Sequence, residues 1–553
     1  MKKETLLELF EKEVSLTSEQ VKIASKTQIL SSKTIDEVLI ELDFVTSLEV
    51  AEVKSIYYDL PLVDLIIVKP QIEALKLLKK SEAIKRNILP ISVKNNTLTL
   101  AVDGLENFKI IDHLERITGM DIKFVIAQKQ LILHHLQLDY QELNNPISKA
   151  IENFLDDYKT DDSIDLNILV KLLFNSAIKV RATDIHITPE KYTINIFFRI
   201  DGVLHFYYSL PLALHLGIGV VIKNICKLDI SKKRIPQDGS FSYSFIDKNY
   251  DMRLSTIPTN MGENIVIRLL EKGVSLISVK HLGLSEINQK KVLSYFNKPY
   301  GVILVTGPTG SGKTTTLYTA LKNINTLEKN VLTIEDPIEY QFSFIKQTQL
   351  NEKSGYSFES AIKSFMRQDP DVILVGEIRD QVTASLAMRA SITGHLVLST
   401  LHTNDAISTI ARLEDLGIKP FLIGSGLLCI LNQRLVRKLC PYCKEKEVFS
   451  EQQLLNKGIM QSIIDEVENI TIYKSCGCGV CDNSGFIGRE IIIEILDIGS
   501  QLQSLIQSRA NAIEIYDYVK SKNIRLLRDD GYLKVLQGIT TFSEIDRVVN
   551  KSS

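Results

Sequence analysis

A glycine-rich segment near the middle of the chain has the residue types that hold a phosphate group. Residues 307–314 fit the pattern G-x-x-x-x-G-K-[ST] and lie between an apolar run at 302–305 and a helical pattern at 315–323. The glycines let the backbone curl so that several N–H groups converge on phosphate oxygens, next to the positive end of a helix. In such a loop the lysine contacts the β- and γ-phosphates, and the threonine hydroxyl binds Mg²⁺. We therefore predict an ATP site formed by Gly307, Pro308, Thr309, Gly310, Ser311, Gly312, Lys313 and Thr314. A glycine-rich turn that matches by chance is the alternative, and the flanking strand and helix argue against it.

Two groups of carboxylates follow predicted buried strands. Glu335 and Glu339 come after the apolar run 331–334, and Glu377 follows the run 372–375. Polar side chains at the carboxyl ends of parallel strands converge on one ligand site. Phosphoryl transfer to water needs a carboxylate that helps to hold Mg²⁺ and another that orients the attacking water. We assign Glu377 to Mg²⁺ and its water shell, and Glu339 to the water, with Glu335 as its substitute. The alternative for Glu335 is a place in a helix N-cap.

A histidine follows the next apolar run along the chain. His402 lies in Thr400–Asp405, directly after residues 396–399, and His395 lies before that run. A histidine and a threonine at this edge can sense the γ-phosphate by hydrogen bonding. Taken alone, either histidine fits a structural role better than a functional one.

Cysteines are concentrated in one segment of the chain. Five of the seven lie between residues 440 and 481, and they include the pairs Cys440/Cys443 and Cys478/Cys481. Two C-x-x-C pairs supply the four thiolates of a structural zinc site. Cys476 is a competing ligand on spacing alone, and unliganded reduced thiols are the alternative to a metal.

The composition is that of a globular cytoplasmic protein. Lys plus Arg (65) nearly balances Asp plus Glu (67), so there is no overall positive field for a nucleic-acid backbone. The N-terminus lacks the apolar core of a secretory signal. The longest apolar stretch, 421–431, is well short of the roughly 20 residues that span a bilayer. We therefore expect no direct membrane insertion, and any membrane association to go through a partner.

The chain is long enough for three or four domains. We predict an α+β domain at 1–145, with a hairpin around Asn95-Asn96, and a linker at 146–165, which is rich in Asn and Asp. A second α+β domain occupies 166–285, and alternating strands and helices indicate a parallel sheet in 286–553. Before residue 286, the expected helices are at 108–117, 129–136 and 166–179. The expected strands there are at 89–93, 98–102, 122–126, 185–187, 193–199 and 203–208.

Four blocks of sequence resemble those of the secretion-superfamily ATPases, the motors of type II secretion and type IV pilus assembly. Residues 307–314, 334–339, 369–380 and 393–406 are similar to their Walker A, Asp, Walker B and His boxes, in the same order and spacing. The resemblance continues upstream through 182–186, 199–202, 234–239 and 253–268, and it is weak over the first 145 residues.

The resemblance implies a fold and a set of further site residues. The expected fold is multidomain α/β: a RecA-like P-loop ATPase core at 286–553, a preceding PAS-like α+β domain, an N-terminal α+β domain, and a small zinc-binding subdomain at 440–481. Members form hexameric rings, in which Arg253 and Arg268 approach the phosphates. Both arginines are otherwise plain salt-bridge partners. A family pattern of Gly-Cys-x-x-Cys followed by residues 485–489 selects Cys478 over Cys476.

The function that the resemblance implies is ATP-driven assembly of a type IV pilus, with type II secretion as the alternative. Such a motor acts on an inner-membrane platform protein, and its N-terminal region binds an accessory protein. A nucleic-acid translocase on the same core is a second class of function, but it needs a basic channel lined by aromatics, and the chain has no Trp. Some relatives bind cyclic di-GMP through glycine-patterned repeats. Residues 1–60 contain no glycine, so we do not predict that ligand.

Overall fold

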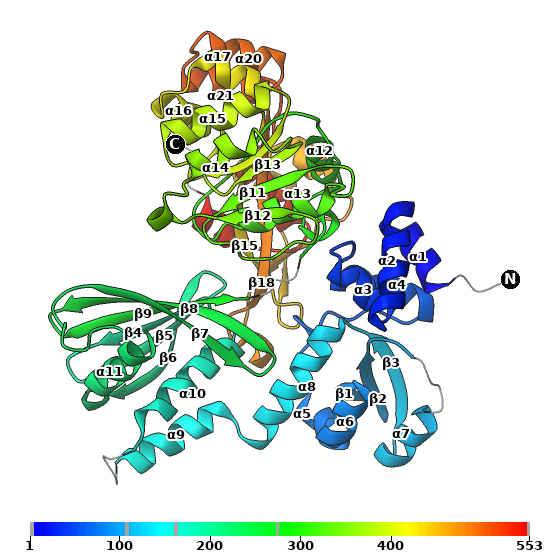
Figure 1. Cartoon of the computed structure of the whole chain (residues 1–553). Helices are drawn as coiled ribbons and strands as arrows, with labels where there is room; N and C mark the ends of the chain where they lie inside the picture. The colour runs from blue at the N-terminus through cyan, green and yellow to red at the C-terminus, as the bar shows by residue number, and fades with distance from the viewer. Residues whose placement is uncertain (1–4, 106–109, 160–163, 273–275, 550–553) are drawn as a thin grey trace. The chain divides into compact units, whose positions relative to one another are not determined.

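The computed structural model describes residues 5–105, 110–159, 164–272 and 276–549. The chain forms two compact units, one of residues 1–14 and 47–274 and the other of residues 15–46 and 275–553. Among the described residues, no helix combines the length and the apolar character that crossing a bilayer requires. Figure 1 traces the chain from its blue N-terminus to its red C-terminus.

The first unit contains a small three-stranded sheet in order β1-β2-β3. Strands β1 and β2 are antiparallel, and Asn95 and Asn96 both have positive φ in the turn between them, which confirms the predicted hairpin. Strand β3 is parallel to β2. The predicted helix 108–117 begins at Ile110 within the described residues, and its first two residues lie outside them. The elements are α1 (Leu6–Val14), α4 (Ser47–Tyr58), α5 (Ile72–Leu77), α6 (Lys80–Arg86), β1 (Leu89–Lys94), β2 (Thr97–Val102), α7 (Ile110–Thr118), β3 (Asp121–Ile126) and α8 (Lys129–Asn144).

The predicted linker 146–165 is largely helical. Helix α9 (Ile147–Tyr158) buries Ile147, Ile151 and Phe154 in the same hydrophobic cluster as α10 (Leu166–Lys179). The Asn and Asp residues of this helix alternate with these apolar residues at helical spacing, so residues 147–158 are part of the folded unit.

A six-stranded sheet follows, in order β6-β5-β4-β9-β8-β7, and all its paired strands are antiparallel. Helices α10 and α11 share its hydrophobic cluster. The predicted strands at 185–187, 193–199 and 203–208 are present, as is the turn at Asp201-Gly202. The elements are β4 (Asp184–Pro189), β5 (Thr193–Ile200), β6 (Val203–Pro211), α11 (His215–Ile225), β7 (Gln237–Phe245), β8 (Lys248–Thr259) and β9 (Gly262–Glu271).

The second unit is built on a seven-stranded sheet in order β12-β11-β13-β14-β10-β15-β18. The first six strands are parallel, and β18 is antiparallel to β15. Val302 and Leu304 enter one hydrophobic cluster, whereas Ile303 and Val305 enter another. Both faces of the sheet are therefore covered, which explains the continuous apolar runs. The strands are β10 (Gly301–Thr306), β11 (Val331–Glu335), β12 (Lys346–Gln349), β13 (Val372–Val375), β14 (Leu396–Leu401), β15 (Leu427–Leu439) and β18 (Phe486–Asp497).

Helices cover both faces of this sheet. Helices α12 and α13 contribute to the cluster that contains Ile303, and α14 to α17, α20 and α21 contribute to the one that contains Val302. The helices of this unit are α12 (Glu286–Phe296), α13 (Lys313–Asn323), α14 (Phe358–Phe365), α15 (Gln381–Ile392), α16 (Ala406–Asp415), α17 (Pro420–Gly426), α18 (Glu451–Asn456), α19 (Gln461–Glu466), α20 (Ser500–Gln507), α21 (Ala512–Ser521), α22 (Leu527–Leu536) and α23 (Phe542–Val548).

Residues 15–46 differ from the prediction, which placed all of 1–145 in one domain. They form α2 (Ser18–Ser31) and α3 (Ile35–Glu41) and group with the second unit. The physical reason is a set of contacts from Asp43 and Phe44 to residues 340–344. No local sequence pattern signals these contacts, which are about 300 residues apart in the chain.

Candidate active site and metal centre

The glycine-rich loop lies between β10 and α13, as predicted, and α13 begins at Lys313. Gly307 has φ 137°, and a Cβ at this position would lie 2.4 Å from the carbonyl oxygen of Gln433. Gly312 also has positive φ, at 89°. Any other residue would strain these two positions. The backbone curl that gathers N–H groups at the start of α13 therefore depends on glycine.

Lys313 is buried at the centre of the site. Its ammonium donates hydrogen bonds to the carbonyl oxygens of Gly307 at 2.9 Å and Pro308 at 3.0 Å. Burial lowers the pKa of Lys313 to about 8, and the nearby carboxylate of Glu377 opposes the shift. A desolvated cation beside the loop is an electrostatic match for the phosphates of a nucleotide.

The Walker B and His segments meet at this lysine. His402 Nε2 lies 3.7 Å from Glu377 Oε2, and the Glu377 side chain is 19% exposed. Arg379 pairs with Glu377 and lies 3.8 Å from Asp336. Burial and the charge of Lys313 lower the pKa of His402 below its ordinary value, which favours the neutral imidazole, while Glu377 opposes the shift. The structure thus brings together Lys313, Glu377 and His402 from three separate sequence blocks.

Glu335 and Glu339 have different environments. Glu335 is buried, and its carboxylate accepts hydrogen bonds from Tyr318 Oη at 2.5 Å, Thr333 Oγ1 at 2.6 Å and Gln347 Nε2 at 3.1 Å. Both of its oxygens are therefore engaged inside the protein. Glu339 is exposed, and its backbone N–H donates to Tyr318 Oη at 3.1 Å. Glu335 is thus engaged inside the protein, and the water-orienting role of Glu339 stays a prediction.

Sequence reasoning missed two residues that support the loop. Gln433, on β15, accepts a hydrogen bond from Thr316 Oγ1 and donates one to the Ser311 carbonyl oxygen, both at 2.8 Å. Tyr318, on α13, links Glu335 to the backbone of Glu339. The polar pair Asn432-Gln433 inside the apolar run of β15 is the signal that was available for Gln433, because buried polar side chains need partners.

The predicted arginines lie in the first unit. Arg253 on β8 and Arg268 on β9 are directly opposite in the strand register, and both are exposed. Arg268 Nε donates to Asp184 at 3.0 Å, and Arg253 Nε lies 3.7 Å from Asp251. Both arginines therefore have carboxylate partners within the sheet. Their approach to the phosphates stays a prediction.

Four cysteines form a cluster of the kind that binds zinc. The Sγ atoms of Cys440, Cys443, Cys478 and Cys481 all lie within 4.8 Å of one another. The Cys440–Cys478, Cys443–Cys481 and Cys478–Cys481 Sγ distances are 3.9, 3.8 and 3.7 Å. Zn–S bonds of about 2.3 Å give a tetrahedron with edges of about 3.8 Å. The four thiols fit zinc, whereas Cys476 is exposed and outside the cluster.

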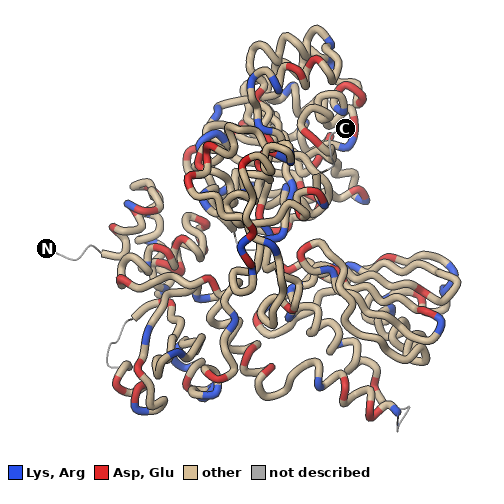
Figure 2. The backbone as a smooth tube through the Cα atoms, turned by 180° about the vertical axis from the view of Figure 1, so that it is seen from behind, with Lys and Arg blue, Asp and Glu red and all other residues tan. Residues whose placement is uncertain are grey.

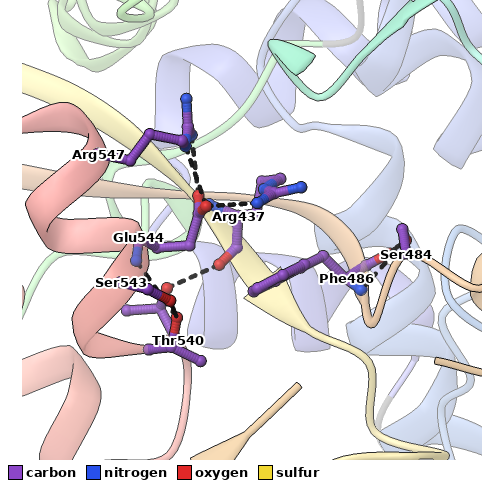
Figure 3. Close-up of polar contacts among 8 residues, drawn as sticks. Arg437, Ser484, Phe486, Thr540, Ser543, Glu544 and Arg547 are labelled. Carbon is purple, nitrogen blue, oxygen red and sulfur yellow. Dashed lines mark hydrogen bonds and ion pairs between the residues drawn. The ribbon is translucent and has the colours of Figure 1, made fainter. Parts of the chain in front are cut away.

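The cluster lies between the end of β15 and the start of β18, and α23 with the segment before it contacts β15. Glu544 on α23 accepts hydrogen bonds from Arg437 and Arg547 (Figure 3). Thr540 Oγ1 donates to the Arg437 carbonyl oxygen at 2.8 Å, and the Arg437 guanidinium lies 4.1 Å from the Phe486 ring centroid. These contacts hold the end of β15 and the start of β18 beside the segments that contain Cys440 and Cys481.

The arrangement defines a P-loop ATPase. The Thr314 hydroxyl and the Glu377 carboxylate are oxygen ligands of the type that Mg²⁺ prefers, at the start of α13 and the end of β13. When bound, Mg²⁺ would neutralise charge on the phosphates. The loop and Lys313 provide the donors and the positive charge that a phosphate group requires.

The chain belongs to the type II/IV secretion system protein family, whose profile matches residues 159–547. It is 35% identical to the type IV pilus assembly ATPase PilB of Myxococcus xanthus, and the match covers 97% of each chain. It is 41% identical to type II secretion system protein E of Dickeya dadantii, over 77% of this chain and 86% of that protein. The protein is therefore a secretion or pilus ATPase.

Two further similarities concern parts of the chain. The MshEN domain family matches residues 58–144, within the region that resembled the motors only weakly in the sequence. A crystal structure of the pilus retraction motor PilT with bound ADP is similar over 69% of this chain and 96% of that chain, at 25% identity and a TM-score of 0.46.

Proposed function

We propose that this ATPase drives extension of a type IV pilus at the inner membrane. The observation that carries the proposal is the match to a pilus assembly ATPase over 97% of both chains, N-terminal region included. A second pilus assembly ATPase, from Acinetobacter baylyi, is 34% identical over 93% of this chain. The matches to type II secretion proteins have higher identity, but they cover about three quarters of the chain. Whole-chain similarity therefore favours the pilus.

The residues of the site divide the chemistry of hydrolysis among them. The loop N–H groups and Lys313 bind the β- and γ-phosphates and stabilise the charge that develops on the transferred group. Glu339 orients the attacking water from the end of the turn after β11. Glu377, beside Arg379 and His402, would help to hold Mg²⁺ and its water shell. The lowered pKa of His402 favours the neutral imidazole, whose N–H can donate a hydrogen bond to the γ-phosphate.

The assembly that we propose is a homohexamer. In a ring, Arg253 and Arg268 would reach phosphates and stabilise charge during transfer. Their exposure and their position side by side on neighbouring strands support this role. The motor would act in the cytoplasm on an inner-membrane platform protein, and the N-terminal domain would bind an accessory protein.

Type II secretion is the second candidate, and the family match supports it as well. The two candidates differ in the fibre that is built, so an experiment in cells separates them. The gene would be deleted and restored with the wild type or with Glu377→Gln. We expect surface pili to be lost on deletion and to return only with the wild type, while type II cargo export is unchanged. Loss of export with pili intact would replace the pilus by a secretion system.

A nucleic-acid translocase is not favoured. Figure 2 shows Lys and Arg interspersed with Asp and Glu over each unit. The formal net charge of the chain is -2. Binding to a nucleic-acid backbone requires a concentration of positive charge and falls steeply with salt. ATPase stimulation by DNA that disappears at high salt would reverse this conclusion.

A further inference from the structure

A compact contact joins the segment after α3 to the turn that follows Glu339. The Asp43 carboxylate accepts a hydrogen bond from the Tyr340 hydroxyl, and another from the Ser343 backbone N–H at 2.7 Å. The ring of Phe44 stacks on Phe344, with centroids 5.9 Å apart and planes at 6°. All of these residues belong to the second unit. The contact therefore links the N-terminal helices to a segment of the ATPase core.

The contact is specific rather than a surface encounter. Asp43 is held at φ 59°, and burial raises the pKa of its carboxyl, while the Tyr340 and Ser343 hydrogen bonds and the Lys322 ammonium oppose the shift. Phe44 is only 7% exposed. The Asp43 carboxylate is half-buried, and hydrogen-bond donors offset the cost of removing it from water. Residues 340–343 supply those donors, so the turn and the N-terminal segment hold each other in place.

A continuous set of contacts leads from Tyr340 into the core. The Tyr340 ring meets Phe342 edge-on at 5.0 Å, and Phe342 meets Tyr318 edge-on at 5.3 Å. Gln347 adds a second link, because its Nε2 donates to the Tyr340 carbonyl oxygen at 2.9 Å and to Glu335 at 3.1 Å. Closely packed side chains have low compressibility, so a shift of Tyr340 is passed on to Phe342 and Tyr318.

Tyr318 is the end of this path. Its buried hydroxyl donates to Glu335 and accepts from the backbone N–H of Glu339. Tyr318 lies on α13, the helix that starts at Lys313. One hydroxyl therefore fixes the backbone of Glu339 relative to the helix that carries the phosphate loop.

We infer that Asp43 and Tyr340 are positioning residues for ATP hydrolysis. They hold the turn at 340–344, and through Phe342 and Tyr318 they fix where Glu339 stands relative to the phosphates. The N-terminal segment 15–46 thereby sets the rate of the chemical step. The inference rests on the proposed role of Glu339 and is independent of whether the fibre is a pilus.

The contact should affect turnover and leave nucleotide binding intact. Phosphate binding is made by the loop amides and Lys313, and none of these atoms contacts Asp43 or Tyr340. A displacement of about 1 Å in a water-orienting group costs up to roughly a hundredfold in rate. We expect a loss of about tenfold in kcat, with KM and nucleotide affinity within about twofold of the wild type.

The test uses the full chain and two conservative substitutions. Tyr340→Phe keeps the ring but removes the hydroxyl that donates to Asp43. Asp43→Asn replaces one carboxylate oxygen by an NH₂ group, which cannot accept a hydrogen bond from either Tyr340 or Ser343. The matched controls are Tyr300→Phe and Asp415→Asn, at two exposed positions of the same unit. Steady-state ATPase kinetics and the affinity of a non-hydrolysable ATP analogue would be measured for all four. Hydrogen exchange would follow the Ser343 amide, which should exchange faster in Asp43→Asn.

The expected result is a lower kcat for both variants, with controls at wild-type rates. The double variant should be slowed by less than the product of the two single effects, because both substitutions loosen the same attachment of residues 340–343 to Asp43. Wild-type kcat in Tyr340→Phe and Asp43→Asn would overturn the inference, even if both proteins melt at lower temperature. A further variant, Glu339→Gln, tests the proposed role of Glu339 separately. Full turnover in that variant would refute the proposed role of Glu339, whatever the two positioning variants do.

Discussion

The affinity for ATP should depend on pH through Lys313. Burial lowers the pKa of this lysine to about 8, within the range of pH 7 to pH 9. About nine tenths of the free protein carries the ammonium at pH 7, and about one tenth does at pH 9. A bound triphosphate strongly favours the charged form. Nucleotide binding therefore takes up a proton above pH 8, and the dissociation constant should rise about tenfold between pH 7 and pH 9.

The matched variant is Lys313→Met, which keeps the length of the side chain without the charge. Its affinity for a fluorescent ATP analogue should be at least about a hundredfold lower at pH 7, and nearly constant from pH 7 to pH 9. Binding would be measured by fluorescence titration at constant ionic strength. A wild-type affinity that does not change over this range, or a variant with the same slope as the wild type, would refute the account of the lysine.

Four other outcomes test the remaining assignments. Glu377→Gln should bind ATP normally but lose at least about a hundredfold in kcat, and unchanged turnover would move the catalytic role elsewhere. Arg253→Ala should lower turnover of the assembled protein about a hundredfold, so intact hydrolysis would leave Arg253 as a salt-bridge partner. Metal analysis should return about one zinc per chain, and Cys443→Ser should lose it; a metal-free wild type would contradict the site. Burial raises the pKa of Glu494 to about 7, above its unfolded value of about 4.5. The folded state therefore binds the proton more tightly than the unfolded state, and the free energy of unfolding falls as the pH rises from about 4.5 to 7. That loss is up to about 3 kcal/mol, and melting curves of Glu494→Gln should show a weaker decline over this range than those of the wild type.

Much of the nucleotide site could be predicted because its residues follow local patterns. A parallel strand that is buried on both faces is a continuous apolar run, and the residues after each run share one edge of the sheet. The positions of Lys313, Glu377 and His402 followed from that rule, and the structure brings the three together. The cysteine cluster followed from ligand spacing in the same way.

The supporting residues were not predictable, because they act over long separations in the chain. Gln433 holds a loop 122 residues away, and Asp43 meets a turn 300 residues away. Tyr318 read as an ordinary helical residue, although its hydroxyl joins two segments of the site. The helix α9 was misread as a linker, because Asn and Asp content outweighed the spacing of Ile147, Ile151 and Phe154.

A structure of the protein with Mg²⁺ and a non-hydrolysable ATP analogue is the most direct test of the central claim, that four separate sequence blocks form one site of ATP hydrolysis. The account predicts that the β- and γ-phosphates lie on residues 307–314 within hydrogen-bond reach of Lys313, with Glu339, Glu377 and His402 around the same γ-phosphate. A nucleotide bound elsewhere, or any of these three side chains directed away from the γ-phosphate, would contradict it.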